Sequence, residues 1–383
     1  MEFGIFVQGH VPHSKLAADP DFEHTSLMND IAIAKAADKA GFKYLWASEH
    51  HFLDEYSHLA SNDVFLGYLA AATERIHLGS GIFNPLPQAN HPVKVAEKVA
   101  TLDHLSGGRF EFGTGRGAGS REILGLGLPD TTVTKEIWAE VVREFPKMWT
   151  QDSYSHDGKW FSMPERNILP KPWKKPHPAM WYAAGNPPSY EMAARMGLGV
   201  LGFSVGSPAD AETAVASYKK AIPAAEPIGA YVNDNVMVTS SAVCLTDGKR
   251  ARHAASTMGM GRLQSLVFRY HDTFPRPDWV PEWPAVLPEP TVEEVEWRLR
   301  NGYLICGDPD EVLAQVKRYE AVGVDQLVLG LPIQLSLADT LETIELFGKH
   351  VIPRLDKDPV HRTTRFRSAA AARGSGNGNG NGN

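Results

Sequence analysis

Trp46-Ala47-Ser48-Glu49-His50-His51-Phe52 begins as an apolar run and ends in an acid and two adjacent histidines. A short apolar run between two helical patterns predicts a buried strand. In a barrel of parallel strands, the residues that follow the carboxyl end of each strand build the reaction site. We therefore take Glu49, His50 and His51 as the first candidates for chemistry.

Short apolar runs alternate with amphipathic helical patterns along most of the chain, which is typical of βα units around a parallel sheet. We predict strands at residues 2–8, 44–48, 76–80, 110–114, 179–183, 199–203, 236–244 and 326–330. Eight parallel strands are the number that closes a barrel. The sequence therefore predicts an α/β fold, a single (β/α)8 TIM barrel with insertions that spans residues 1–355.

Three segments depart from this alternation. Residues 154–161 predict a small hairpin that turns at Asp157-Gly158. Residues 269–288 are rich in proline and aromatic residues, so we place an insertion at about 265–290, with either a lid over a pocket or plain packing as its role. Residues 356–383 end in Asn-Gly repeats, and their composition predicts a disordered tail.

Composition narrows the class of protein. The 383 residues carry a net charge of −7, without a cluster of Lys and Arg among aromatics, which argues against nucleic acid as a partner. Cys244 and Cys306 are too few for a disulfide framework or a Cys-based zinc site, so we expect both to be reduced. The N-terminal residues do not have the pattern of a signal peptide, and no segment approaches the ~18 apolar residues of a membrane span. We expect a soluble cytoplasmic protein with no membrane partner.

Side-chain alternation along a strand separates the two histidines. His50 shares a face with Trp46, whereas His51 sides with Glu49. A structural, hydrogen-bonded histidine is the alternative for each, but the position at a barrel strand end favours a catalytic role for His50. A metal site is not predicted, because the sequence has no His-Glu-x-x-His helix and no second group of acid and histidine at ligand spacing.

A glycine-rich loop follows the strand predicted at 110–114. Residues 113–119 read Gly-Thr-Gly-Arg-Gly-Ala-Gly, so backbone N–H groups and the forked Arg116 cation could approach a phosphate together. Gly113, Gly115 and Ala118 formally match a dinucleotide fingerprint, but another loop at 125–130 follows in place of an immediate helix. A surface ion pair is the alternative role for Arg116.

A second candidate anion site follows the strand predicted at 179–183. Gly185 and Asn186 lead into Ser189 and a helix that runs through 192–196. The N–H groups and the dipole at a helix N-terminus favour an anion, and Ser189 could donate a hydrogen bond to a phosphate. Ordinary N-capping by Ser189 is the alternative, and the two roles are compatible.

As a set, these motifs resemble the luciferase-like flavin-dependent monooxygenases, the family of bacterial luciferase. The resemblance is carried by residues 49–52, 90–93, 102–110, 113–117 and 184–198, and it returns at 306–312 and 323–329. It implies a barrel with insertions that binds reduced FMN at its mouth, supplied by a separate flavin reductase. It also implies that O2 and a small, largely apolar aldehyde, ketone or terpene react there through a C4a-peroxyflavin.

The resemblance also implies roles for individual residues. His50 would take the position of the family's catalytic histidine, beside the flavin. A cis peptide bond would join Gly81 to Ile82. The residues that the resemblance places around the cofactor are Gly81, Ile82, Gly115, Arg116, Gly185, Asn186 and Ser189.

Two positions depart from the family pattern. Thr114 stands where bacterial luciferase has a reactive cysteine, which argues against light emission but leaves oxygenation open. Asn186 stands where many relatives have serine, which changes the expected phosphate contacts.

Two alternative functions stay open. Relatives on the same barrel use a deazaflavin coenzyme for hydride transfer without oxygen. A flavin-binding protein without turnover is the second alternative, although binding alone does not require His50. For any of these functions we expect a homodimer.

Overall fold

The computed structural model describes residues 1–117, 119–128, 130–203, 206–274, 276–332 and 334–376. Eight parallel strands form a closed barrel, because β9 pairs with both β8 and β11, and β11 pairs with β1. In spatial order the barrel strands are β1 (Glu2–Val7), β2 (Tyr44–Ala47), β3 (His77–Ser80), β4 (Phe110–Thr114), β7 (Ala179–Ala184), β8 (Gly199–Gly202), β9 (Val236–Cys244) and β11 (Gln326–Gly330). The predicted TIM barrel is confirmed, with each strand end within one residue of its expected position.

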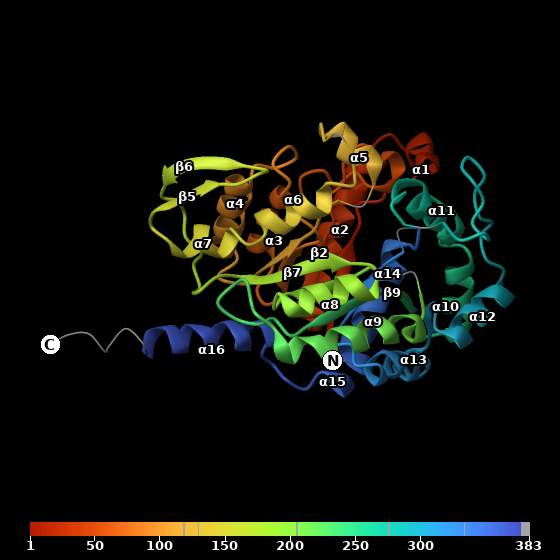
Figure 1. Ribbon diagram of the computed structural model, residues 1–383. Coiled ribbons are helices and arrows are strands. Elements are labelled where there is room, and N and C mark those ends of the chain that lie inside the picture. Colours follow the sequence, from red (N-terminus) through yellow and green to blue (C-terminus); the bar gives the residue numbers. More distant parts are fainter. Residues whose placement is uncertain (118, 129, 204–205, 275, 333, 377–383) are drawn as a thin grey trace.

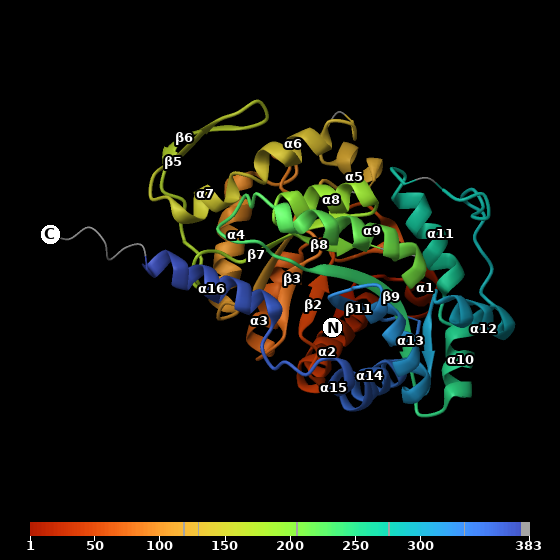
Figure 2. The same ribbon diagram turned by 60° about the horizontal axis from the view of Figure 1, so that its bottom comes forward.

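Helices surround the barrel, as Figures 1 and 2 show. Those from the first half of the chain are α1 (His13–Ala18), α2 (Phe22–Ala40), α3 (Asn62–Ala72), α4 (Pro92–Leu105), α5 (Ser120–Gly125), α6 (Thr134–Val141), α7 (Phe145–Thr150) and α8 (Pro187–Arg195). Those from the second half are α9 (Pro208–Ala221), α10 (Gly248–Ser256), α11 (Met260–Tyr270), α12 (Val292–Asn301), α13 (Pro309–Ala321), α14 (Leu337–Leu346), α15 (Ile352–Leu355) and α16 (Arg362–Gly376). Short 3-10 helices lie at Asp54–Tyr56 and Ile222–Ala224, and a π-helix at Phe347–Val351.

Large aromatic side chains fill the inside of the barrel. Trp46 and Trp181 meet edge to face with ring centroids 5.1 Å apart, and both are fully buried. Their neighbours on adjacent strands are glycines: a Cβ at Gly79 would lie 2.2 Å from the Trp46 ring, and one at Gly199 would lie 2.5 Å from Trp181. The barrel is therefore a packed core, and a ligand site must lie at its rim.

Strand β9 is long enough to serve two sheets. Its first part pairs with β11 in the barrel, and its last residues pair with β10 (Ile305–Gly307), a strand that the sequence analysis missed because it has only three residues. Beside β10, a second hydrophobic cluster forms between α10, α12 and the ends of β9 and β10. Both cysteines, Cys244 and Cys306, are buried and free, as expected.

The two internal insertions differ in structure. The predicted hairpin is confirmed, with β5 (Tyr154–Asp157) antiparallel to β6 (Ser162–Arg166). In the insertion at 265–290, the first six residues belong to α11, and the described residues that follow form neither helix nor strand. Trp283 of this insertion lies under the Arg269 guanidinium, 4.0 Å from the ring centroid, while Trp279 is 58% exposed. Trp279 still meets Phe268 edge to face, with ring centroids 6.3 Å apart, so both aromatics have a packing partner.

The expectation of a disordered tail is wrong for residues 356–376. Helix α16 occupies most of this range, and Figure 1 shows it running from the barrel towards the C-terminus. Arg367 is buried and forms two hydrogen bonds of 2.8 Å with the Asp103 carboxylate, and Thr363 donates to Glu111 inside the barrel wall. Composition missed this helix because these polar groups are satisfied by partners far away in the sequence. Residues 377–383 lie outside the described residues.

One buried histidine gives the fold a dependence on pH. His177 Nδ1 lies 2.9 Å from the Pro178 carbonyl, and its Nε2 accepts the Ala230 N–H at 2.9 Å, an arrangement that only the neutral ring can make. Burial lowers the pKa of His177 from 6.5 to about 4. Because the unfolded chain binds a proton at His177 more readily than the folded protein does, the free energy of unfolding is unaffected above pH 6.5 and decreases as the pH falls from 6.5 towards 4.

We therefore expect the free energy of unfolding of His177→Gln to depend less on pH below 6.5 than that of the wild type. Between pH 6.5 and 5 the wild type should lose about 2 kcal/mol more of its free energy of unfolding than this variant, since one pH unit corresponds to about 1.4 kcal/mol per proton. Urea unfolding at the two pH values measures the difference. The exposed His253→Gln serves as control, and equal losses in all three proteins would contradict the prediction.

Candidate active site

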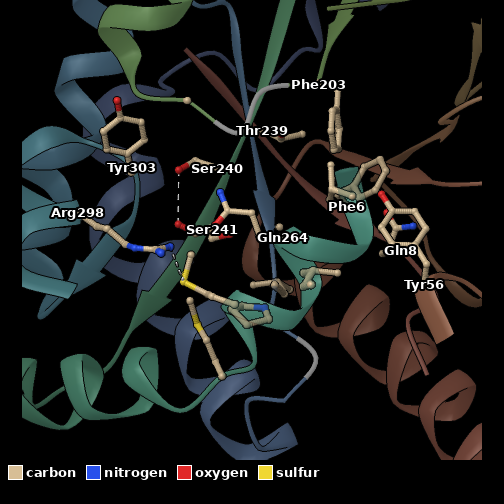
Figure 3. A pocket seen from close by; sticks show the side chains of 18 of the residues that line it. Phe6, Gln8, Tyr56, Phe203, Thr239, Ser240, Ser241, Gln264, Arg298 and Tyr303 are labelled. Atoms are coloured by element: carbon tan, nitrogen blue, oxygen red, sulfur yellow. Dashed lines mark hydrogen bonds between the residues drawn. The ribbon is translucent and has the colours of Figure 1, made fainter. Parts of the chain in front are cut away.

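A cavity of about 470 Å³ opens at the carboxyl ends of the barrel strands. Figure 3 shows its wall, to which Phe6 and Gln8 contribute from the end of β1, Thr239 to Ser241 from β9, and Tyr56 from the segment after β2. Most of the lining is aromatic, methionine or aliphatic. A concave, largely apolar space with a few polar groups is typical of a site for a small molecule.

His50 is fixed beside this cavity by a buried acid. Strand β2 ends at Ala47, so His50 lies in a loop, where its N–H donates to the Leu59 carbonyl at 3.2 Å. Its Nδ1 is 3.2 Å from both carboxylate oxygens of Glu122 on α5. Burial by itself raises the pKa of Glu122, but the hydrogen bond and the charge of His50 more than offset that effect. The pKa is therefore lowered overall, and Glu122 is a carboxylate. It holds the proton of His50 on Nδ1 and leaves Nε2 for chemistry.

The neighbouring histidine points elsewhere. The backbone N–H of His51 donates to Glu122 at 2.7 Å, but its ring faces Glu49, with Nε2 3.7 Å from Oε1. The interaction with the Glu49 carboxylate raises the pKa of His51. The two side chains diverge as the sequence predicted, although in a loop and not in a strand.

A second polar pair completes this cluster. His271, which follows α11, places its Nε2 3.0 Å from the hydroxyl of Tyr56. The rings of His50 and His271 are perpendicular with centroids 5.8 Å apart, and His50 also meets Tyr56 edge to face. Burial lowers the pKa of His271 to about 3, so this ring is neutral beside the ionised Glu122. Sequence reasoning found neither Tyr56 nor Glu122 nor His271.

Arg116 lies in a second cavity, of about 440 Å³, with hydroxyl groups and the Lys135 amine around it. Its guanidinium donates to Thr134 at 3.2 Å. Burial raises the pKa of the neighbouring Tyr182 hydroxyl, and the charge and hydrogen bond of Arg116 offset only part of that effect. In the part of the chain that the structure describes, no carboxylate lies within ion-pair distance of Arg116. The alternative of a surface ion pair is therefore wrong.

The loop after Arg116 differs from the expectation. No helix was expected between the glycine-rich loop and the loop predicted at 125–130, yet Ser120–Gly125 form α5. Ala118 of the dinucleotide pattern lies outside the described residues. Asp272 borders the same cavity and accepts hydrogen bonds from both the N–H and the hydroxyl of Ser120. The segment after α11 is thereby tied to the start of α5.

The Gly185 turn leads into α8, but its cap differs from the one predicted. Asn186 is the N-cap, and its Oδ1 accepts from the Ser189 N–H at 3.1 Å and from the Ser189 hydroxyl at 2.6 Å. Because β4 and β7 pair in parallel, this turn and the Arg116 loop leave neighbouring strands at the same edge. Gly185 faces the insertion, where a Cβ would lie 3.5 Å from the Phe274 ring.

The peptide bond between Gly81 and Ile82 is cis, as the resemblance implied. It directly follows β3, where the Gly81 N–H donates to the Ala47 carbonyl at 2.7 Å. A Cβ at Gly81 would lie 3.3 Å from Phe6 in the wall of the large cavity, and one at Gly115 would lie 3.2 Å from Ile82. The cis bond therefore lies between the large cavity and the Arg116 loop.

The mouth of the barrel thus fits FMN by its donor chemistry. Arg116 and Lys135 offer two cations next to hydroxyl groups, and the one carboxylate in the described lining, Asp272, is bonded to Ser120 and makes no ion pair with either cation, which suits a phosphate. The apolar cavity on the other side of Gly81 suits a flat organic ring and a substrate. No group of three or more His, Cys, Asp or Glu side chains among the described residues could hold a metal ion.

Both the sequence and the fold have relatives among known proteins. The family model described as luciferase-like monooxygenase matches residues 1–326. The oxygenase component of a flavin-dependent trigonelline monooxygenase from Acinetobacter baylyi is 23% identical over 376 residues, 94% of this chain and 98% of that protein. An F420-dependent glucose-6-phosphate dehydrogenase from Kineococcus radiotolerans is 26% identical over 326 residues, 84% of this chain and 91% of that protein. The oxygenating constituent of 3,6-diketocamphane monooxygenase from Pseudomonas putida, solved with FMN, superposes with a TM-score of 0.70 at 19% identity, covering 92% of this chain and 98% of the other.

Proposed function

The chain belongs to the family of luciferase-like monooxygenases, and from this we propose that it is a flavin-dependent monooxygenase that uses reduced FMN and O2. Its substrate is a small, largely apolar organic molecule of the aldehyde, ketone or terpene kind. The observation that carries the proposal is the His50–Glu122 pair at the same barrel mouth as an apolar cavity and the cationic cavity of Arg116.

Each part of the mouth has a role in this proposal. Arg116 and Lys135 bind the phosphate of FMN, with the turn from Gly185 to Ser189 beside it. Reduced FMN, when bound, supplies the electrons that activate O2. His50 holds or moves a proton through its Nε2, and Glu122 fixes its tautomer.

The apolar walls of the large cavity exclude water from the reacting groups. In this role the insertion after α11 acts as a lid, with Trp279 at the rim of the cavity. A separate flavin reductase delivers reduced FMN, in keeping with the relative that is named as an oxygenase component. The protein acts as a homodimer, which its mass in solution tests. Among its described residues, no helix combines the length and hydropathy of a membrane span.

Cofactor choice and reaction with oxygen are tested in one experiment. The protein is titrated without oxygen with reduced FMN or with reduced F420, and oxygenated buffer is then added while flavin spectra are recorded. We expect tight binding of reduced FMN and a long-lived absorbance that differs from both reduced and oxidised FMN. Binding of F420 alone would instead favour hydride transfer, the second candidate, which the similarity to an F420-dependent dehydrogenase supports. Binding of FMN without any altered reaction with oxygen would favour a protein that only binds flavin.

The role of Arg116 can be isolated by comparing two flavins. Arg116→Met should weaken the binding of FMN by about 10- to 100-fold, since hydrogen bonds to a charged group contribute about 1.5 to 3 kcal/mol. Binding of riboflavin, which lacks the phosphate, should change less than about twofold. Fluorescence titration measures both affinities, with the exposed Arg166→Met as the matched control. Equal weakening of both flavins would show that Arg116 acts through the fold of the loop.

A further inference from the structure

One arginine in the wall of the large cavity forms no ion pair with any acid among the described residues. Arg298 extends from α12 into the cavity, as Figure 3 shows, and its Nη1 donates to the thioether of Met260 at 3.7 Å. Among the described residues, no carboxylate oxygen lies within 4.0 Å of its guanidinium. A thioether sulfur is a weak acceptor, so most of the donors of this guanidinium remain available.

The arginines of the neighbouring helices α10 and α11 differ from Arg298. Arg252 on α10 pairs with Glu311 at 2.6 Å and also bonds Glu296, and Arg262 on α11 pairs with Glu55. For Arg298, burial lowers the pKa, and the nearby acids Glu294 and Glu289 do not outweigh that effect. A half-buried cation that faces a cavity without a counter-charge costs free energy, so it is expected to serve a ligand.

The rest of this end of the cavity combines apolar walls with a few polar groups. Figure 3 shows the side chains of Arg298, Ser241 and Gln264 turned towards the same part of the cavity. The Oε1 atom of Gln264 is buried and has no hydrogen-bond partner among the described residues. A terminal amide can turn either its oxygen or its nitrogen to a ligand. Met258 and Leu263 lie beside these groups in the lining.

Arg298 does not belong to the phosphate site. Arg116 follows β4, whereas the part of the cavity with Arg298 contains residues of β9 and the end of β11. In the closed barrel, β4 is separated from β11 by three strands in either direction, so the two arginines approach the mouth from opposite sides. One phosphate group cannot bind both.

We propose that the aldehyde, ketone or terpene-like substrate is an organic anion, whose largely apolar body also carries a carboxylate or a similar oxyanion that binds Arg298. The guanidinium donates two parallel hydrogen bonds to two oxygens of the anion, and Gln264 contacts the same group. The apolar body of the substrate extends towards Tyr56 and His50. This inference rests on the proposed function, since it specifies the substrate class of the same site. Arg298 is then the residue that selects charged over neutral substrates.

The charge requirement can be tested by binding alone, with two fluorescent probes that share one aromatic framework. 8-Anilinonaphthalene-1-sulfonate carries an oxyanion, and N-phenyl-1-naphthylamine lacks it. We expect the wild-type protein to bind the sulfonate more tightly than the neutral amine. Arg298→Met should weaken binding of the sulfonate at least about 10-fold and that of the amine less than about twofold. Arg298→Lys should recover part of the affinity for the sulfonate.

The matched control is Arg300→Met, which removes the same charge from an exposed position of the same helix and should leave both affinities unchanged. The proposal is overturned if the wild type binds the amine as tightly as the sulfonate, or if Arg298→Met and Arg300→Met behave alike. Because no flavin or oxygen takes part, failure of the proposed monooxygenase function does not change this result. Binding of reduced FMN to Arg298→Met, measured separately, should equal that of the wild type.

Discussion

His50→Ala is expected to lower the rate of oxygenation by about 100- to 10,000-fold, the usual range for a positioned acid or base. The ring that is lost is the one whose Nδ1 is held by Glu122 and whose Nε2 has no hydrogen-bond partner among the residues that the structure describes. FMN should still bind, because the cationic cavity of Arg116 does not include His50. Single-turnover product formation and the lifetime of the oxygen-reacted flavin absorbance measure the loss.

The adjacent histidine provides the control for this prediction. His51→Ala removes an equal ring from the next position, but one that faces Glu49, so its effect should stay below about threefold. Glu122→Gln should fall between the two, since an amide keeps the shape of the contact and loses the charge that fixes the tautomer. If His50→Ala retained full activity with FMN bound, the catalytic assignment of His50 would be wrong.

Arg367→Met is expected to lower the free energy of unfolding by about 3 to 5 kcal/mol, the cost of leaving a buried charge without its partner. The Asp103 carboxylate has no exposed side-chain surface and accepts two bonds from Arg367 and one from the Lys174 N–H. Without Arg367 only the backbone bond would remain. Urea unfolding at pH 7 measures the difference.

A double variant separates the ion pair from the packing of the helix. Asp103→Leu combined with Arg367→Met removes both charges, and it should recover most of the loss seen for Arg367→Met alone. As a control, Arg365→Met removes an exposed arginine of α16 and should change stability by less than about 1 kcal/mol. A loss below about 1 kcal/mol for Arg367→Met would mean that α16 contributes little to the stability of the fold.

The barrel could be predicted from the sequence because each of its strands is a short apolar run with its own helical neighbour. His50 and Arg116 could be found because both directly follow a strand. Glu122 could not, since α5 has only six residues and shows no clear periodicity. Tyr56 and His271 are 215 residues apart, and nothing local connects them. Arg298 has the pattern of an ordinary helix residue, and only the fold reveals that it lacks an acid.

The tail shows the opposite error. Its polar composition suggested that it could not order itself, and taken alone that argument is sound. In the folded chain, Arg367 bonds Asp103 and Thr363 bonds Glu111. Each pair is more than 250 residues apart in the sequence, and the barrel brings its two members together. A segment that binds to an existing surface does not need a core of its own.

The pairing of β9 with both β11 and β10 has a consequence for how the substrate preference of this enzyme could evolve. The helices α10 and α12 pack on a small core of their own beside β10, and α12 carries Arg298. Arg116 and His50 lie on loops of the first four barrel strands. The segment that joins α10 to α12 also carries His271 and Asp272, which contact Tyr56 and Ser120. New substrate preferences are therefore expected to arise by substitutions on α12, which leave the oxygen-activating side of the barrel mouth in place, and not by exchange of the whole segment.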